Sequence, residues 1–153
     1  MTKKIIIVGG GPAGLSAAIN AASEGIAVTL LDKANALGGQ FHESNDIENF
    51  PGVPMTNGPK LSAAMIEQAK QFGVEFQCPM KAAKLVPQAD GSITVITEEY
   101  EELKADAVVL ALGLSWRRLD ATGVPTLMGR GVTYGAAPKL AGNVKTVMIV
   151  GGG

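Results

Sequence analysis

Three glycines at the spacing Gly9-x-Gly11-x-x-Gly14 form the first group of residues in the chain that could do chemistry. Glycine permits a tight turn and lets backbone amides approach a phosphate closely, and the positive end of a following helix favours the same anion. The pattern alone is also compatible with a glycine-rich turn that binds nothing. It becomes informative where a strand precedes it and a helix follows it, so the flanking residues decide its meaning.

Asp32 is the second group, 18 residues after Gly14. An acidic side chain at the end of the next strand accepts hydrogen bonds from a ribose 2′-hydroxyl, and its negative charge disfavours a 2′-phosphate there. Together the glycines and Asp32 predict a dinucleotide-binding site. These two features do not separate FAD from NAD.

The residues around the glycines supply the elements that such a site needs. Ile5 to Val8 is a short apolar run, typical of a strand covered on both faces of a parallel sheet. From Pro12 to Ser23 apolar residues recur at helical spacing, and Gly25 suits the end of that helix. Ile26 to Leu31 predicts a second buried strand. Strand, helix and strand in about 30 residues make a right-handed βαβ unit, so we expect a three-layer, Rossmann-like α/β fold.

The next segment combines a long loop with a helix. Residues 34–54 are rich in Gly, Asn and Pro and lack a period, which is typical of a binding loop. A helix is expected to open at Asn57 and to stop at Gly73. Its predicted apolar face consists of Leu61, Ala64, Met65 and Phe72.

Short β-type runs follow this helix. Val74 to Phe76, Ala82 to Pro87 and Ser92 to Thr97 predict the strands of a small antiparallel insertion, the last two joined by a turn at Asp90-Gly91. Ala105 to Leu112 is predicted to return as one buried strand.

The last forty residues change character. Residues 114–143 lack a period and are expected to cross between domains, and Thr146 to Val150 then repeats the strand pattern before residues 151–153. A strand that runs into three glycines needs a helix after it, so we expect the chain to be part of a longer protein. The expected organisation is residues 1–113 as the N-terminal part of one nucleotide-binding domain, 114–143 as a crossover and 144–153 as the start of a second.

The composition excludes several classes of protein. With 153 residues, 46% of them hydrophobic, the chain can bury a core. Thirteen basic and fourteen acidic residues include no basic block, so nucleic acid is not an expected partner. No segment reaches the roughly 18 apolar residues of a membrane helix, and a cytoplasmic location is expected. Cys78 is the only cysteine, so the chain can form no internal disulfide and no cysteine-based metal site.

Further motifs separate FAD from NAD. The triplet Gly38-Gly39-Gln40 and the run at 47–52, Ile-Glu-Asn-Phe-Pro-Gly, resemble the segments that hold the flavin in a known family. This is the thioredoxin reductase-like group of FAD/NAD(P)-dependent pyridine nucleotide-disulfide oxidoreductases. The resemblance covers essentially the whole chain, including the turn at 111–113 and a second glycine fingerprint from Gly151.

The resemblance implies a set of FAD contacts. The two glycine turns would hold the diphosphate and the flavin edge, Asp32 the ribose, Asn49 the flavin ring, and the backbone near Lys81 the adenine. The implied cofactor-binding residues are Gly9, Gly11, Pro12, Ala13, Gly14, Asp32, Lys33, Gly38, Gly39, Gln40, Asn49, Lys81, Ala82, Ala111 and Gly113. Leu112 stands where the family usually has threonine, so it offers no hydroxyl.

The redox cysteines of the family are missing from their expected place. In disulfide-reducing members a Cys-x-x-Cys follows a lead that is present here as residues 129–134, but the two cysteine positions hold Gly135 and Pro138. Dithiol exchange needs a thiolate and a resolving thiol. The resemblance therefore implies the branch that lacks the redox Cys-x-x-Cys.

The expected activity is that of an FAD-dependent oxidoreductase, which passes electrons from NAD(P)H through FAD to an external acceptor. A ferredoxin-like protein is one candidate acceptor, and the resemblance also implies a homodimer. Residues 1–153 alone are expected to bind FAD weakly and to be inactive, and no catalytic residue is assigned. The alternative is a non-catalytic flavin-binding or structural module that keeps the fold. The missing cysteines favour that alternative, whereas the intact glycine motifs oppose it.

A few other side chains carry weaker hypotheses. His42 could deliver a proton to the flavin, although a loop histidine is usually solvated. Tyr134 could stack on a ring or simply pack at a domain junction. Arg117 and Arg118 could steer an acidic partner or form an ordinary solvated surface.

Overall fold

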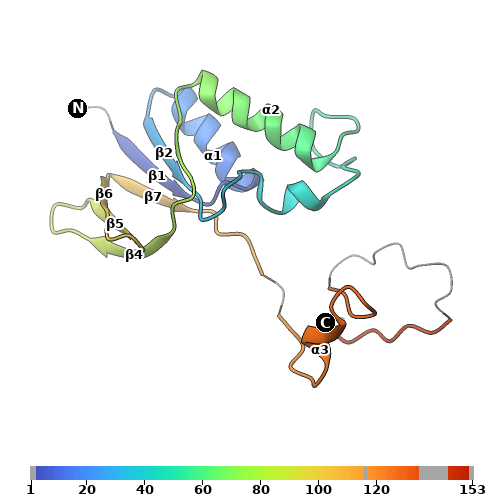
Figure 1. Ribbon diagram of the computed structural model, residues 1–153. Coiled ribbons are helices and arrows are strands. Elements are labelled where there is room, and N and C mark those ends of the chain that lie inside the picture. Colours follow the sequence, from blue (N-terminus) through green and yellow to red (C-terminus); the bar gives the residue numbers. More distant parts are fainter. Residues whose placement is uncertain (1–2, 116, 135–144, 152–153) are drawn as a thin grey trace. The chain divides into compact units, whose positions relative to one another are not determined.

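The computed structural model describes residues 3–115, 117–134 and 145–151. The chain divides into two compact units between Gly113 and Leu114. The first unit contains a four-stranded parallel sheet and a three-stranded antiparallel sheet (Figure 1). The expected α/β class and the small antiparallel insertion are therefore confirmed.

The parallel sheet has the strand order β3-β2-β1-β7. Its strands are β1 (Lys4–Val8), β2 (Ala27–Leu31), β3 (Glu75–Gln77) and β7 (Ala107–Leu110). The helices α1 (Pro12–Ser23) and α2 (Gly58–Gln71) both lie on one face of this sheet (Figure 1). The predicted βαβ unit is confirmed by the parallel pairing of β1 with β2 on either side of α1.

The core beneath the helices follows from the strand period. Successive side chains of a strand point to opposite faces, so Ile7 faces the helices while Ile6 and Val8 face away. Ile7 packs with side chains from both helices and from β2, among them Leu15, Ala18, Leu30, Met65 and Ala69. Ile6 and Ile7 are both 0% exposed, which confirms that β1 is covered on both faces.

The antiparallel sheet covers the other face. Its strands are β4 (Ala82–Pro87), β5 (Ile93–Thr97) and β6 (Glu102–Ala105), in the order β4-β5-β6. Val95 and Ala105 of this sheet pack against Ile6, Val8 and Leu31 of the parallel sheet. The first unit thus has three layers: helices, parallel sheet and antiparallel sheet (Figure 1).

The prediction for Val74 to Phe76 was wrong. Glu75 and Phe76 belong to β3, which pairs in parallel with β2 through Thr29–Glu75 and Leu30–Phe76 and takes no part in the antiparallel sheet, while Val74 lies just before the strand. α2 returns the chain to the same end of the sheet, as a crossover between parallel strands requires. A run of three residues is too short for its own pattern to reveal this pairing.

The prediction of one buried strand from Ala105 to Leu112 was also wrong. The run breaks at Asp106, which separates β6 of the small sheet from β7 of the parallel sheet. Asp106 binds Lys4 twice, donating its amide to the Lys4 carbonyl oxygen at 2.9 Å and accepting from the Lys4 amide at 2.8 Å. β7 forms an edge of its sheet, and Val109 and Leu110 are exposed there.

The inward face of α2 differs in part from the predicted one. Leu61 and Met65 are buried as expected, but Ala64 is exposed and Phe72 lies beyond the last helical residue at 45% exposure. Ser62 and Ala69 are buried in their place. The apolar pattern did not predict the whole inward face because a polar residue, Ser62, occupies one of its positions.

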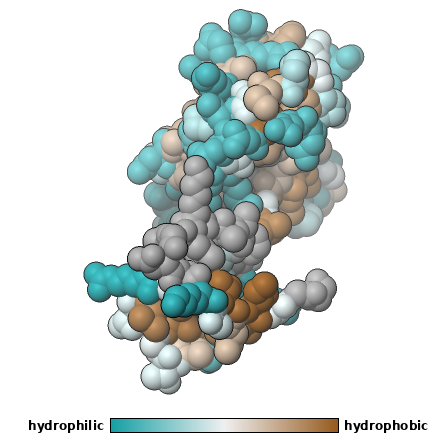
Figure 2. All heavy atoms as spheres, turned by 90° about the vertical axis from the view of Figure 1, so that its right-hand side faces the viewer, coloured by the Kyte–Doolittle hydropathy of each residue, from teal (hydrophilic) through white to brown (hydrophobic). Residues whose placement is uncertain are grey.

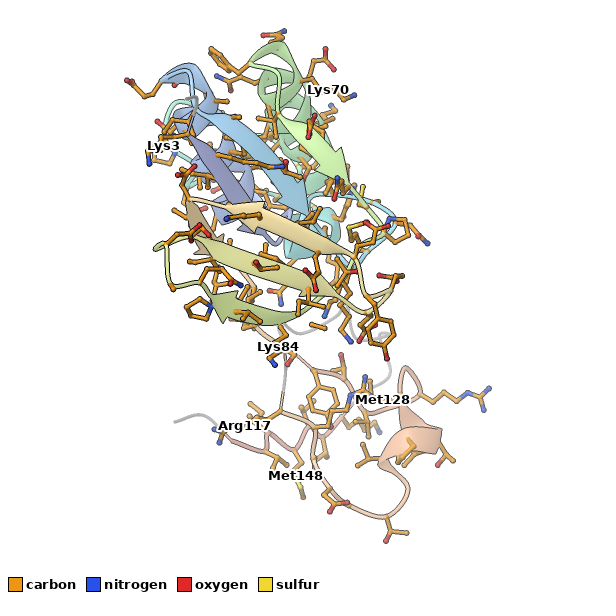
Figure 3. The ribbon with its side chains drawn as sticks, turned by 90° about the vertical axis from the view of Figure 1, so that its left-hand side faces the viewer. Lys3, Lys70, Lys84, Arg117, Met128 and Met148 are labelled. Atoms are coloured by element: carbon orange, nitrogen blue, oxygen red, sulfur yellow. The ribbon has the colours of Figure 1, made fainter. Side chains whose placement is uncertain are left out.

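The described part of the second unit has little regular structure. Its described residues, 114–115, 117–134 and 145–151, contain one short helix, α3 (Val124–Leu127), and a bridge between Met128 and Val132. Many apolar side chains lie at its surface (Figure 2), and Met128 and Met148 are labelled in Figure 3. The predicted strand at Thr146 to Val150 is not formed within the described residues, since a strand requires a hydrogen-bonded neighbour.

Candidate nucleotide-binding site

The turn between β1 and α1 is closed by two glycines that have no room for a side chain. Gly9 has φ +111°, and a Cβ atom there would overlap the carbonyl oxygen of Ala111. A Cβ atom on Gly14 would overlap the carbonyl oxygen of Gly9. Glycine at residue 9 therefore lets the turn lie against the segment after β7, and glycine at residue 14 lets α1 lie against the end of β1.

Gly11 differs from these two glycines. Its backbone, with φ −76°, is one that any residue adopts, and the nearest atom to a Cβ there would be the Cα of Gly39 at 3.9 Å. Packing inside the protein therefore does not explain why residue 11 is glycine. An open backbone at this point is what a closely approaching ligand needs.

The N-terminus of α1 opens onto the same turn. Gly11 is the N-cap residue and no side chain caps the helix, while Pro12 occupies the first turn, where it has no amide to leave unpaired. The first turn contains no acidic residue. The early backbone amides, including those of Ala13 and Gly14, thus remain available to an anion at the positive end of the helix.

Asp32 lies beside this turn with its carboxylate fixed. Oδ2 accepts a hydrogen bond from the Gly10 amide at 2.6 Å, and Oδ1 accepts one from the Ala34 amide at 2.8 Å. The side chain is partly buried at the carboxyl end of β2. Each carboxylate oxygen has a second lone pair, so Asp32 can also accept from a sugar hydroxyl.

A second glycine turn lies against the first. Gly38 and Gly39 have φ of +117° and +55°, and the Gly38 amide donates to the Gly10 carbonyl oxygen at 2.8 Å. A Cβ atom on Gly39 would lie 3.1 Å from the Cα of Gly11. The two turns therefore form one surface, although Gly38 lies 27 residues after Gly11 in the sequence.

Two other predicted segments reach this surface. The Ala111 amide donates to the Val8 carbonyl oxygen at 2.8 Å, which sets the end of β7 beside Gly9. The Met80 amide donates to the Asp32 carbonyl oxygen at 2.6 Å and leads directly into Lys81 and Ala82. The structure therefore brings the segments of Lys81, Ala82 and Ala111 to the same edge of the sheet.

The remaining predicted residues lie at the surface. Lys33 and Gln40 are exposed, Gln40 in the short 3-10 helix η1 (Gly39–Glu43), and Gly113 is exposed with φ +66°. Asn49 is exposed in the loop that the Ile47–Thr56 bridge closes, and no hydrogen bond joins it to the glycine turns within the described part of the chain.

The residues with weaker hypotheses are placed as follows. His42 is exposed in η1. In the second unit the Tyr134 hydroxyl accepts from the Leu119 amide at 2.7 Å, which favours a packing role there. Arg117 and Arg118 are exposed. Trp116 and the two cysteine positions, Gly135 and Pro138, lie outside the described residues.

Sequence reasoning missed two residues that shape the surface. A Cβ atom on Gly10 would overlap Leu37, and the Gly10 amide and carbonyl tie Asp32 to Gly38. Three consecutive glycines were the available signal for Gly10. Ser62 lies buried beneath Gly38, and its spacing of four from Gly58, on the same helix face, was the only signal for it.

The small sheet also has a hollow, which lies apart from the two glycine turns. A hollow of about 430 Å³ on the small sheet is lined by Gln88, Ala89, Asp90, Thr94, Glu102 and Lys104. Its Lys104 and Asp90 already pair with each other at 2.8 Å.

In residues 3–115, 117–134 and 145–151, no three His, Cys, Asp or Glu side chains are grouped as metal ligands would be. None of the helices described there is both long and apolar enough to cross a membrane.

Curated relatives resemble nearly the whole chain. The F component of alkyl hydroperoxide reductase from Xanthomonas campestris pv. phaseoli is 37% identical over 153 residues, which are 97% of this chain and 28% of the relative. Thioredoxin reductase of Bacillus subtilis (strain 168) is 36% identical over 151 residues, 97% of this chain and 46% of the relative. The chain thus spans less than half the length of each.

A solved structure and a protein family are also similar to most of this chain. The thioredoxin reductase of Lactococcus lactis superposes with a TM-score of 0.77 and 32% identity, over 87% of this chain and 43% of that one. The family described as pyridine nucleotide-disulphide oxidoreductase matches residues 3–153. With a thioredoxin reductase-like fold and a family match over almost its full length, this chain belongs to the pyridine nucleotide-disulphide oxidoreductases.

Proposed function

We propose that the surface between the two glycine turns binds the diphosphate of FAD. The observation that supports this most directly is Gly11, whose side-chain position is open although its backbone conformation does not require glycine. The uncapped start of α1 and the carboxylate of Asp32 lie on either side of it. An anion next to a ribose fits this pair of groups.

Each part of the surface then has a separate task. The early amides of α1 bind diphosphate oxygens, and Asp32 accepts from the ribose hydroxyls. Gly38 and Gly39 hold the second turn against the first, and the backbone near Lys81 and Ala82 borders the adenine. Gln40 and Asn49 contact the flavin end, and Pro12, Lys33, Ala111 and Gly113 complete the rim.

We extend the proposal to an oxidoreductase that uses a nicotinamide nucleotide and an external electron acceptor. Bound FAD supplies the redox chemistry, while the chain binds it and orients it. Cys78 is the only cysteine among the 153 residues, so this chain contains no dithiol that could accept the electrons. The exposed Arg117 and Arg118 suit an acidic acceptor such as a ferredoxin-like protein. A homodimer and a cytoplasmic location stay predictions.

The missing dithiol also favours a second candidate function, a module that binds flavin without turnover or keeps only the fold. An absorption spectrum of the purified full-length protein, and not of residues 1–153 alone, separates the two. The enzyme is expected to show flavin bands that bleach on adding NADPH or NADH. Bands that persist with both reductants support the non-catalytic flavin module, and a colourless protein that takes up no FAD contradicts the proposed site.

The substitution that tests the site is Gly11→Val. Because a side chain at residue 11 meets no atom closer than 3.9 Å at Cβ, the fold is expected to persist while FAD affinity falls about a hundredfold. Circular dichroism checks the fold and quenching of flavin fluorescence measures the affinity. Gly91→Ala, at a turn of the small sheet, is the control for replacing a glycine outside the site. Its φ of +82° makes alanine strained there, so this variant is expected to lose some stability but no FAD affinity. Unchanged FAD affinity in Gly11→Val would contradict the assignment.

A further inference from the structure

The N-terminal turn of α2 packs directly beneath the second glycine turn. The Gly58 amide donates to the Ser44 carbonyl oxygen at 2.8 Å, and a Cβ atom on Gly58 would overlap the carbonyl oxygen of Phe41. Ser62 follows one helical turn later, so it shares the face of Gly58. Two small residues therefore let the segment from Gly38 to Ser44 lie close to the helix.

Ser62 is the residue that touches the glycine turn itself. A Cβ atom on Gly38 would lie 2.7 Å from Oγ of Ser62 and 2.9 Å from its Cβ. Ser62 is 1% exposed, and its Oγ finds no hydrogen-bond partner among the described residues. The contact between Ser62 and Gly38 is therefore one of packing, and it requires a small side chain at residue 62.

Gly38 is held from two sides. Its amide donates to the Gly10 carbonyl oxygen at 2.8 Å, and the Ser62 side chain lies beneath it. On the opposite side of the turn, Gly39 lies close to Gly11: a Cβ atom added to Gly39 would lie 3.1 Å from the Cα of Gly11. A larger side chain at residue 62 has to displace the second turn toward the first, which narrows the surface between them.

We propose that Ser62 is a positioning residue for the nucleotide site: its small side chain sets the position of the Gly38 turn and thereby keeps the surface at Gly11 open. This inference rests on the proposed binding of FAD at that surface. Ser62 itself packs beneath the turn and, at 1% exposure, does not reach the surface at Gly11. Its effect is transmitted through Gly38 and Gly39.

The test compares three variants of the purified full-length protein by FAD titration and by thermal unfolding without FAD. Ser62→Val enlarges the side chain beneath Gly38, and its dissociation constant for FAD is expected to rise about tenfold or more. Ser62→Ala is the conservative variant, expected to bind FAD within about twofold of the wild type and to unfold at a slightly higher temperature. Ala69→Val enlarges another buried side chain of the same helix, at 0% exposure, and controls for overpacking alone.

The outcomes separate the inference from the function on which it rests. The role of Ser62 is supported if Ser62→Val loses more FAD affinity than Ala69→Val does while the two variants have the same thermal stability. If Ser62→Val does not fold, Ser62→Thr is measured in its place. Equal affinity in Ser62→Val and the wild type, or an equal loss in Ala69→Val, overturns the role of Ser62 and leaves the site intact. A wild-type protein that takes up no FAD overturns the proposed function, and the role of Ser62 with it.

Discussion

The amide of Gly10 donates a 2.6 Å hydrogen bond to Oδ2 of Asp32, which ties the carboxylate at the end of β2 to the turn at the end of β1. Oδ1 of the same carboxylate accepts from the Ala34 amide at 2.8 Å. The two bonds together require that both side-chain oxygens accept a hydrogen bond, and a carboxylate can do this. Asp32 therefore shapes the glycine turn in the protein itself, apart from any contact with a ribose.

Asp32→Asn is expected to destabilise the first unit. The amide side chain keeps one acceptor oxygen but directs an NH₂ group at the other backbone amide, so one of the two hydrogen bonds of this half-buried side chain is lost, at about 1–2 kcal/mol in the free energy of unfolding. Urea unfolding followed by circular dichroism measures the change. FAD affinity is expected to fall in the same variant, since the ribose loses a charged acceptor.

Asp46→Asn provides the control for removing a carboxylate. Asp46 is exposed in the loop after η1, and its replacement is expected to change the free energy of unfolding by no more than about 0.5 kcal/mol. Equal stability of Asp32→Asn and the wild type would show that the two hydrogen bonds contribute nothing to the fold.

Gly14→Ala is expected to be among the most damaging single changes in α1. The added Cβ would overlap the carbonyl oxygen of Gly9, so helix and strand have to separate. We expect a loss of about 3 kcal/mol, at the upper end of the range for overpacking. Guanidinium unfolding is the measurement.

The control for Gly14 is Gly25→Ala. Gly25 has φ +78° and no atom within 4 Å of its Cβ position, so alanine there meets only the backbone strain of about 1 kcal/mol. If both variants lost the same stability, close packing of α1 on β1 would not be the reason for Gly14.

The acid stability of the first unit is expected to depend on Asp106. The pKa of Asp106 is lowered chiefly by the hydrogen bond from the Lys4 amide, and next by the one from the Lys3 ammonium group. The folded pKa then lies below the unfolded value of about 3.9, so this contribution is complete above that pH and is lost as pH falls through the folded pKa. The difference in Tm between the wild type and Asp106→Asn should therefore shrink from about pH 6 to about pH 2.

Lys3→Gln separates the two causes. It removes the ammonium group, which lies 2.9 Å from Oδ1 of Asp106, but keeps the backbone bond from Lys4. Because the backbone bond is the larger cause, most of the acid dependence should survive in Lys3→Gln. A difference in Tm for Asp106→Asn that stayed constant over this pH range would contradict the assignment.

The sequence predicted those parts of the fold that repeat over many residues or depend on a fixed local conformation. α1 has the predicted bounds because Pro12 and Gly25 mark its ends, and β1 follows from an apolar run. Sheet membership was harder to predict, since the three residues of β3 contain no period of their own. The break at Asp106 depends on hydrogen bonds to Lys4, 102 residues away in the sequence, and no local pattern contains that information.

The candidate site shows the same division. The motif predicted Gly9, Gly11 and Gly14 together, but only the structure separates the two that packing requires from Gly11, which packing leaves open. The contact of Ser62 with Gly38 is also invisible in the sequence, because it depends on how α2 packs against a loop that begins 20 residues before that helix.

The hairpin between β5 and β6 offers a stabilising substitution. Tyr100 has φ +65° and donates its amide to the Thr97 carbonyl oxygen at 3.1 Å, while its side chain is 87% exposed. A left-handed conformation is unfavourable by roughly 1–2 kcal/mol for a residue with a Cβ atom. Tyr100→Gly removes that strain and forfeits little burial, although glycine is more flexible in the unfolded chain. A net gain of about 0.5–1 kcal/mol is expected.

Tyr100→Ala is the matched control, because alanine removes the same exposed ring but keeps the Cβ atom. Its free energy of unfolding should stay within about 0.5 kcal/mol of the wild type, and Tyr100→Asn should fall between Ala and Gly, since asparagine tolerates the left-handed region. Urea unfolding of the four proteins gives the order. If Tyr100→Ala and Tyr100→Gly were both less stable than the wild type by the same amount, the tyrosine ring and not the backbone would determine stability at this turn.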